Sequence, residues 1–290
     1  MSPTTSRGRG RRIVALCAAV ILVMTASLGA YEASRLHTGQ PSEPFGVDQH
    51  DPDRVEATAW ITKVDVASQT MTVLLVDVIP HGSLALKDDD FAEDVVLETN
   101  SVINDRNAMH RGEAFSSVEC RFSLAGTPTD FPFDRYSSAW SLRMTRADGS
   151  VVPLAVTVVS TDAFFSTTPY YDADQDEWLN VDVGMHRSIP TIVFGVFVMA
   201  LMLGLAAAAA LAAYFIVRSR QGLVFGAYSV MAALLFAMIP LRNAVPGSPP
   251  IGSVIDYAAF FIAEAVIAIS LITSVIVGYR HQHELDESKR

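Results

Sequence analysis

Three long apolar runs occupy the last third of the chain, at residues 189–217, 222–241 and 254–279, and short polar segments separate them. The first two runs contain no Asp, Glu, Lys, Arg or His. A helix that crosses a bilayer needs roughly 20 consecutive apolar residues. The pattern therefore predicts three membrane-spanning helices, and we expect Pro240 to end the second of them rather than kink it.

Small residues and short connections predict how these helices pack. Gly195 and Gly204 on the first helix would let neighbouring helices approach closely. Residues 218–221 form a very short turn, so the first two helices are expected to be antiparallel neighbours. Residues 242–250 are rich in Pro and Gly and are predicted to be a hinge without helical structure.

Between residues 54 and 187 the pattern changes to alternating apolar and polar positions, which is typical of half-buried strands. Residues 55–64 and 71–79 flank a polar turn and predict a β-hairpin. Further strands are predicted at residues 95–103, 118–124, 136–144, 151–159 and 178–183. About seven short strands indicate an antiparallel β-sandwich, in which Pro153 would mark an edge strand.

The segment before this domain carries a fourth apolar run, at residues 13–30, preceded by the basic residues 1–12. It is either a signal anchor that is retained or a signal peptide that is cleaved. We favour the retained transmembrane anchor, because the apolar run is long and Leu28 disfavours cleavage after Ala30. Residues 31–53, rich in Pro, Gly and acidic residues, are predicted to link the anchor to the domain.

Charge orients the chain in the membrane. The formal charge is −10 overall, but residues 31–187 hold 26 Asp and Glu against 11 Lys and Arg, which is −15. Cytoplasmic segments carry the excess of Lys and Arg, so the basic N-terminus, Arg218 and Arg220 are predicted to be cytoplasmic. Residues 31–187 of this plasma-membrane protein are then extracytoplasmic, and residues 280–290 are expected to form a solvated, unstructured tail in the cytoplasm. An acidic domain repels nucleic acid, so the expected partners are the lipid bilayer and either further copies of the chain or other envelope proteins.

Two carboxylates lie in the third C-terminal run. Asp256 is in its first turn, where an acid suits the helix dipole and could pair with Arg242 across the hinge. Glu264 is expected near mid-bilayer, where a carboxylate usually faces a partner or a wet cavity. Two interpretations remain open: a proton or cation site or helix-pairing contact, and a protonated side chain hydrogen-bonded to a neighbour such as Tyr228 or Ser229.

Catalytic motifs are absent from the sequence, so no catalytic residue, metal site or cofactor is predicted and the chain is not expected to be an enzyme. The alternating acids of residues 172–177 lack the Gly and Glu of an EF-hand. They are interpreted as a solvated loop, with a looser calcium site as the alternative. Cys17 and Cys120 fall on different sides of the membrane and cannot pair, and Cys120 is predicted to be a core residue.

The most specific motif is the stretch 126–136, Gly-Thr-Pro-Thr-Asp-Phe-Pro-Phe-Asp-Arg-Tyr. It predicts a corner between strands, packed by two aromatic side chains and capped by a carboxylate that accepts backbone N–H bonds. Its candidate structural or coupling residues are Phe131, Pro132, Phe133, Asp134, Arg135 and Tyr136. Taken with the order of anchor, β-domain and three helices, residues 55–279 resemble a family of actinobacterial membrane proteins known as domain of unknown function 4436. That resemblance implies the architecture and the membrane location but no activity.

Residues 131–134 are also similar to the loop between the β-sandwich and the membrane in pentameric ligand-gated ion channels. The hairpin at 55–79 and residues 240–257 resemble parts of the same family. The chain departs from it by lacking paired cysteines around this loop and by having a shorter external domain and three C-terminal helices instead of four. The helix at 222–241 also lacks a charged ring that would select ions.

The sequence therefore favours a non-enzymatic envelope binding or assembly protein that acts through its external β-domain. The alternative is an oligomeric sensor or channel gated through residues 131–136.

Overall fold

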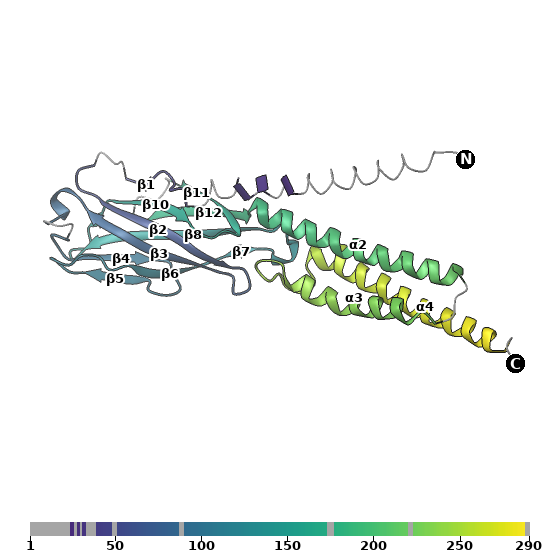
Figure 1. The fold of residues 1–290 in the computed structure, drawn as a ribbon. Helices are drawn as coiled ribbons and strands as arrows, with labels where there is room; N and C mark the ends of the chain where they lie inside the picture. The colour runs from purple at the N-terminus through teal and green to yellow at the C-terminus, as the bar shows by residue number, and fades with distance from the viewer. Residues whose placement is uncertain are drawn as a thin grey trace, which may run out of the picture. The chain divides into compact units, whose positions relative to one another are not determined.

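The computed structural model describes residues 24–25, 28–29, 31–32, 39–47, 51–86, 90–172, 177–219 and 223–287. Most of the predicted anchor, the basic N-terminus, Cys17, Arg220 and most of the acidic loop at 172–177 lie outside these residues. The chain folds into two compact units, a β unit and a helical unit (Figure 1). The β unit comprises the described parts of Met1–Val64, Met71–Phe122 and Ala139–Val193. The helical unit comprises Asp65–Thr70, Ser123–Ser138 and the described part of Phe194–Arg290.

The strands form two sheets, which confirms a β-rich domain ahead of the C-terminal helices. The first sheet has the order β1-β10-β2-β3-β6, with bounds Phe45–Gly46, Leu154–Ser160, Val55–Asp65, Thr70–Pro80 and Val118–Ser123. The second has the order β11-β12-β8-β4-β5, with bounds Phe165–Asp172, Leu179–Arg187, Arg135–Arg146, Val95–Thr99 and Arg106–Met109. The short strands β7, Ala125–Gly126, and β9, Val151–Val152, both pair with β8.

Alternating side chains build the core of the β unit. In β2, Val55, Ala57, Ala59 and Ile61 are buried while the residues between them are more exposed, as expected for a strand with one covered face. Phe122 of β6 and Trp140 of β8 stack across the two sheets, with ring centroids 5.1 Å apart. Cys120, on the same face of β6 as Phe122, is fully buried, which confirms it as a core residue.

Three details of the predicted sandwich are wrong. Strand β10 runs parallel to β2, with Leu154 opposite Val55, so the first sheet is mixed rather than antiparallel. Pro153 is not in an edge strand but lies between β9 and β10, where the chain passes from the second sheet to the first. A residue without an N–H suits this break in pairing. Strands β5 and β11 were not predicted, because neither shows clear alternation in the sequence.

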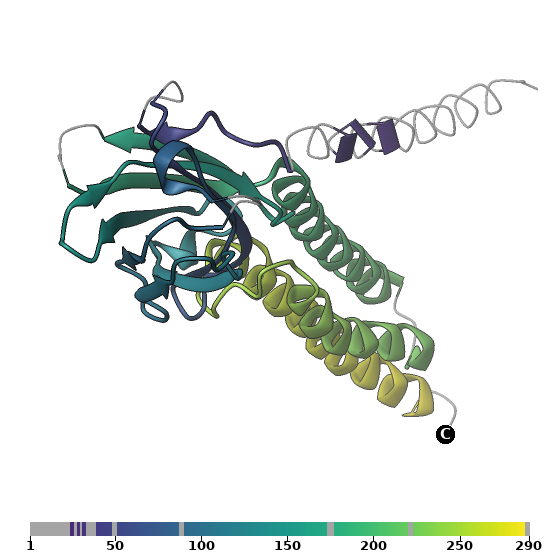
Figure 2. The ribbon, with the colours of Figure 1, turned by 90° about the vertical axis from the view of Figure 1, so that its left-hand side faces the viewer.

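The helical unit contains the three predicted helices, each long and apolar enough to span a membrane. They are α2, Ile189–Ser219, then α3, Phe225–Asn243, and last α4, Phe261–Glu287, which continues from a π-helical turn at Asp256–Phe260. Figures 1 and 2 show the three helices lying side by side. The chain is thus built as a multi-pass membrane protein.

Two predicted helix ends are wrong. Pro240 lies inside α3, which continues to Asn243, so the first two residues of the predicted hinge are helical. The predicted unstructured tail is helical as far as Glu287. Contacts between side chains four residues apart, Gln282 with Asp286 at 3.2 Å and His283 with Glu287 at 3.4 Å, support this last turn.

Small and flexible side chains fill the space between the helices. The buried residues of α2 recur every three or four positions, as at Met202, Ala206 and Ala209, and form one face of the helix. The large side chains point outward, and Phe236 of α3 is 79% exposed in the isolated chain. This arrangement fits lipid around the bundle. The predicted close approach at Gly204 is wrong, because a Cβ there would meet nothing within 4 Å among the described residues.

Candidate functional site

The loop that carries the most specific sequence motif belongs to the helical unit. This loop, residues 126–136, contains a 3-10 turn at Pro128–Asp130, and the N–H of Phe133 donates to the carbonyl of Asp130 at 2.8 Å. The Phe131 side chain is fully buried, whereas the Phe133 side chain is 58% exposed. The prediction that both aromatic rings pack the corner is therefore correct for the first and wrong for the second.

Phe131 packs directly into the core between the helices. It belongs to one buried cluster with Val198 and Met202 of α2. A Cβ placed on Gly195 would lie 3.1 Å from Cβ of Pro132 and 3.3 Å from Cε1 of Phe131. A larger residue at this position would push the loop away, so Gly195 provides the close approach that the sequence predicted, although its partner is the loop and not a helix.

Buried polar contacts hold the end of the loop. Asp134 is 1% exposed and accepts a hydrogen bond from the Tyr136 hydroxyl at 2.7 Å. Gly126 of β7 pairs with Tyr136, and a Cβ on Gly126 would clash with Cδ1 of the Tyr136 ring. Arg135 points to the exposed side. The loop is thus rigidly tied to the helices through Phe131 and to the start of β8 through Tyr136.

The predicted pair of Arg242 and Asp256 is confirmed. Arg242 Nε donates to Asp256 Oδ1 at 2.8 Å and Nη2 donates to Oδ2 at 2.9 Å, which is the bidentate geometry favoured by a guanidinium and a carboxylate. Oδ2 also accepts bonds from the backbone N–H groups of Gly252 at 2.7 Å and Ser253 at 3.2 Å. Both charged side chains are almost fully buried, at 8% and 1% exposure for the two residues. The pair therefore closes the hinge between α3 and α4.

Glu264 bonds to neither of its two predicted partners, the hydroxyls of Tyr228 and Ser229. Tyr228 donates its hydroxyl to the carbonyl of Ser274 at 3.1 Å, and Ser229 donates to the carbonyl of Phe225 at 3.0 Å. Oε1 of Glu264 is buried, and among the described residues it has no hydrogen-bond partner. A buried carboxyl oxygen without a partner is costly inside a membrane. The structure brings Glu264 together with neither Asp256 nor the loop.

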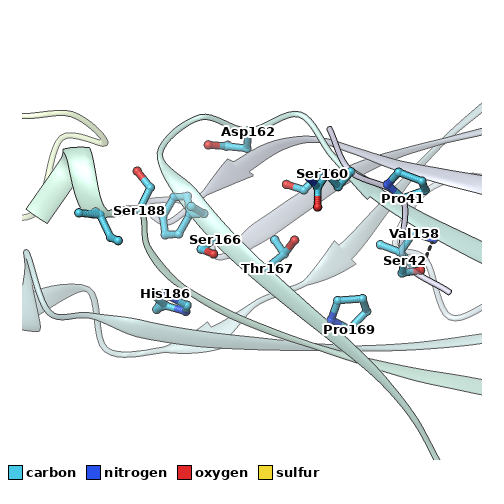
Figure 3. A pocket seen from close by; sticks show the side chains of 13 residues that line it. Pro41, Ser42, Val158, Ser160, Asp162, Ser166, Thr167, Pro169, His186 and Ser188 are labelled. Atoms are coloured by element: carbon cyan, nitrogen blue, oxygen red, sulfur yellow. Dashed lines mark hydrogen bonds between the residues drawn. The ribbon is translucent and has the colours of Figure 1, made fainter. Parts of the chain in front are cut away.

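The β unit contains a cleft that the sequence did not predict (Figure 3). This β11 cleft has a volume of about 330 Å³ and lies between the segment Gln40–Ser42, the end of β10 and strands β11 and β12. Hydroxyl side chains from the first three of these segments and Ser188, just after β12, line it together with Asp162 and His186. Its walls come from three separate parts of the chain, and no spacing in the sequence connects them.

Hydrogen bonds fix the turn at the closed end of the β11 cleft. Asp162 is buried, and its carboxylate accepts bonds from the N–H of Val64 at 2.9 Å and the N–H of Phe164 at 2.8 Å. Ser188 donates to the carbonyl of Ala163 at 2.9 Å. The carboxylate therefore shapes the cleft by holding a β-turn between β10 and β11.

The structure also describes the surroundings of Cys120 and of the other titratable side chains of the β unit. Burial raises the pKa of the Cys120 thiol, which makes it a poor nucleophile at neutral pH. Among the described residues, no three His, Cys, Asp or Glu side chains gather as a metal site would require.

These features define a multi-pass membrane protein with a β-rich domain in front of three helices. Comparison with known families divides the chain at the boundary between the β-rich domain and the first of these helices. Residues 45–185 match a family described as a domain of unknown function, DUF4436, and residues 187–281 match a second, DUF8686. The match to the first family therefore ends at the β-domain and does not extend over the helices as the sequence suggested. No curated protein matches the chain, and neither family description assigns an activity.

Proposed function

We propose that the protein is a non-enzymatic plasma-membrane protein that holds its β-rich domain outside the cytoplasm, where the domain binds a ligand or partner of the cell envelope. The β11 cleft carries this proposal, because it is a preformed hollow lined by polar side chains that are not all used by the fold. Ligand sites are generally concave and already formed before binding.

The placement of charges supports the orientation. Strand β12 ends at Arg187 and α2 begins at Ile189, so the β-domain precedes the first end of α2 along the chain. The other end of α2 carries Arg218, and α4 carries Arg280 toward its end. Arg242 belongs to the opposite side, but its charge is neutralised by Asp256. Arg218 and Arg280 therefore lie at the helix ends that the positive-inside rule assigns to the cytoplasm.

Cysteine labelling tests this orientation. In a background with Cys17→Ser, one variant carries Ser117→Cys in an exposed part of the β-domain and another carries Glu284→Cys in the exposed last turns of α4. A membrane-impermeant maleimide added to whole cells should label the first variant at once and the second only after permeabilisation. Equal protection of the two cysteines, or the reverse order, would overturn the proposed location.

Affinity purification tests the binding role. The intact chain is extracted with a mild non-glycosidic detergent, and its mass is measured together with anything bound to it. We expect either a co-purified envelope component or a defined oligomer. A monomer with no bound component, from which the washing steps also removed no component, would contradict a binding or assembly function.

A second candidate function is an oligomeric sensor or channel. The burial of Phe131 with Val198 and Met202 favours it, because a movement of the loop would displace side chains packed in the helical core. In planar bilayers this function requires a conductance that Asp134→Ala or Glu264→Ala abolishes. A sealed bilayer around a well-formed oligomer would exclude the channel.

A further inference from the structure

We infer that the β11 cleft binds a neutral, polyhydroxylated ligand the size of one or two sugar rings, which deepens the envelope-binding function proposed above and rests on it for its biological setting. The inference starts from Ser160 at the end of β10. Its Oγ is buried, and among the described residues it has no hydrogen-bond partner. Nearly all buried polar atoms in folded proteins are paired, so an unpaired hydroxyl in the wall of a cleft points to a group that arrives from outside.

The other hydroxyls of the cleft separate into two kinds. Ser42 and Ser188 are used by the fold: Ser42 accepts a bond from the N–H of Val158 at 3.0 Å, and Ser188 donates to the carbonyl of Ala163 at 2.9 Å. The side chains of Ser166 and Thr167 on β11 make no hydrogen bond to any described residue. Together with Ser160 they offer three hydroxyls, each able to donate and to accept, on adjoining walls (Figure 3).

Charge selects a neutral ligand. Asp162 is the one carboxylate among the described residues that line the cleft, neither Lys nor Arg lines it, and His186 is its one basic side chain. A phosphate or carboxylate would therefore meet a buried carboxylate with no permanent cation among these residues to offset the repulsion. The two oxygens of Asp162 already accept backbone N–H bonds from Val64 and Phe164, so the carboxylate holds the turn and is poorly placed to neutralise a cation.

Shape favours a sugar over a peptide. Strand β11 is at the end of the second sheet's order, where an extended peptide could in principle add as a further strand. Pro169 lies within β11 and has no N–H, which interrupts such a ladder. Pro41 and Pro169 instead present apolar ring surfaces beside the hydroxyls, as Figure 3 shows. A sugar ring, with its apolar C–H face and hydroxyl rim, matches both kinds of surface.

The test uses the full chain in lipid nanodiscs, because glycoside detergents would compete for the cleft. Maltose, cellobiose and N,N′-diacetylchitobiose serve as neutral probes, glucose 6-phosphate as the charged probe and tetra-alanine as the peptide probe. Binding is measured by saturation-transfer NMR and titration calorimetry. We expect at least one neutral disaccharide to bind with a Kd of about 1 mM or tighter. Glucose 6-phosphate and tetra-alanine should bind at least about tenfold more weakly.

Ser160→Ala separates a binding role from a structural one. The substitution should weaken disaccharide binding by about fivefold or more, while the unfolding temperature without sugar stays unchanged or rises, because it removes an unpaired buried hydroxyl. The exposed Ser117→Ala, outside the cleft, is the matched control and should change neither quantity.

Several results would overturn the inference: no disaccharide binding up to about 50 mM, equal affinity in Ser160→Ala, or preference for the phosphate or the peptide. The maleimide experiment above reports on location alone. A cleft that binds sugar in a cytoplasmic domain would refute only the envelope setting, and an external domain that binds none would refute only the ligand.

Discussion

Removing either partner of the Arg242–Asp256 pair should destabilise the helical unit, and the two losses should be unequal. Five donated hydrogen bonds reach the Asp256 carboxylate, and three of them come from Gly252 and Ser253. Without Arg242 the carboxylate keeps those three donors. With the described residues, Arg242 makes one further bond, from Nη2 to the carbonyl of Pro250 at 2.9 Å. Without Asp256 the guanidinium is therefore a buried charge whose remaining hydrogen-bond acceptor is the carbonyl of Pro250.

The magnitude follows from this difference. Breaking a buried ion pair on one side typically costs 3–5 kcal/mol, because the remaining charge is uncompensated, so we expect about 4 kcal/mol for Asp256→Asn. For Arg242→Met we expect about 2 kcal/mol, because hydrogen bonds to a charged group, each worth about 1.5–3 kcal/mol, continue to solvate the carboxylate. The double variant should be more stable than Asp256→Asn alone, since it also removes the stranded cation.

Titration with sodium dodecyl sulfate, followed by circular dichroism at the helical band, gives the unfolding free energy of each variant. Arg218→Met is the matched control, because this arginine is exposed at the end of α2 and bonds only to the Tyr214 hydroxyl. It should cost less than about 0.5 kcal/mol. If Arg242→Met proved as damaging as Asp256→Asn, or if the two losses simply added, the account of the hinge would be wrong.

Three further predictions concern the loop and the β unit. Phe131→Ala should lower the unfolding free energy of the helical unit by about 3–5 kcal/mol and Phe133→Ala by less than about 0.5 kcal/mol, and equal losses in the same detergent titration would contradict the packing. Cys120 should resist maleimide at pH 8 in the folded chain because burial raises the pKa of its thiol, and rapid labelling would show that it is not in the core. The hydrogen bond from Arg54 lowers the pKa of Glu56 below its ordinary 4.5, so the stability that Glu56 contributes is present above that pH and is lost as the pH falls through its lower folded-state value. In an acid titration Glu56→Gln should lose less stability than the parent protein over that range, and identical curves would refute the linkage.

The elements that the sequence predicted well are those set by local pattern. Apolar length alone identifies α2, α3 and α4, and alternation identifies the β2–β3 hairpin, β6 and β8. The Arg242–Asp256 pair was also predictable, since one charge stands on each side of a hinge that brings them together. In each case the information lies within one continuous stretch of the chain.

Long-range pairing could not be predicted in the same way. The parallel partnership of β10 with β2 joins Leu154 to Val55 across the whole domain, and nothing in either strand specifies it. The β11 cleft was not predicted for the same reason. Nothing in the sequence indicates that Ser160 of β10 and Thr167 of β11 line the same cleft. The candidate partners of Glu264 were wrong because α3 and α4 are apolar on all sides, so the sequence gives no indication of which face turns inward.

Apolar packing between α3 and α4 does not determine how each helix is rotated about its own axis. Two polar contacts determine this orientation instead. Near the start of α3, Tyr228 bonds to the carbonyl of Ser274, and at its end Arg242 bonds to Asp256. Between lipid-exposed helices the hydrophobic effect gives no preference among rotations, so these two contacts hold the antiparallel pair in register at both ends. Glu264 takes part in neither contact, and the packing of the pair does not require it. Oε1 of Glu264 is buried without a hydrogen-bond partner among the described residues, so this carboxyl group adds a desolvation cost and no stabilising bond to the helix pair.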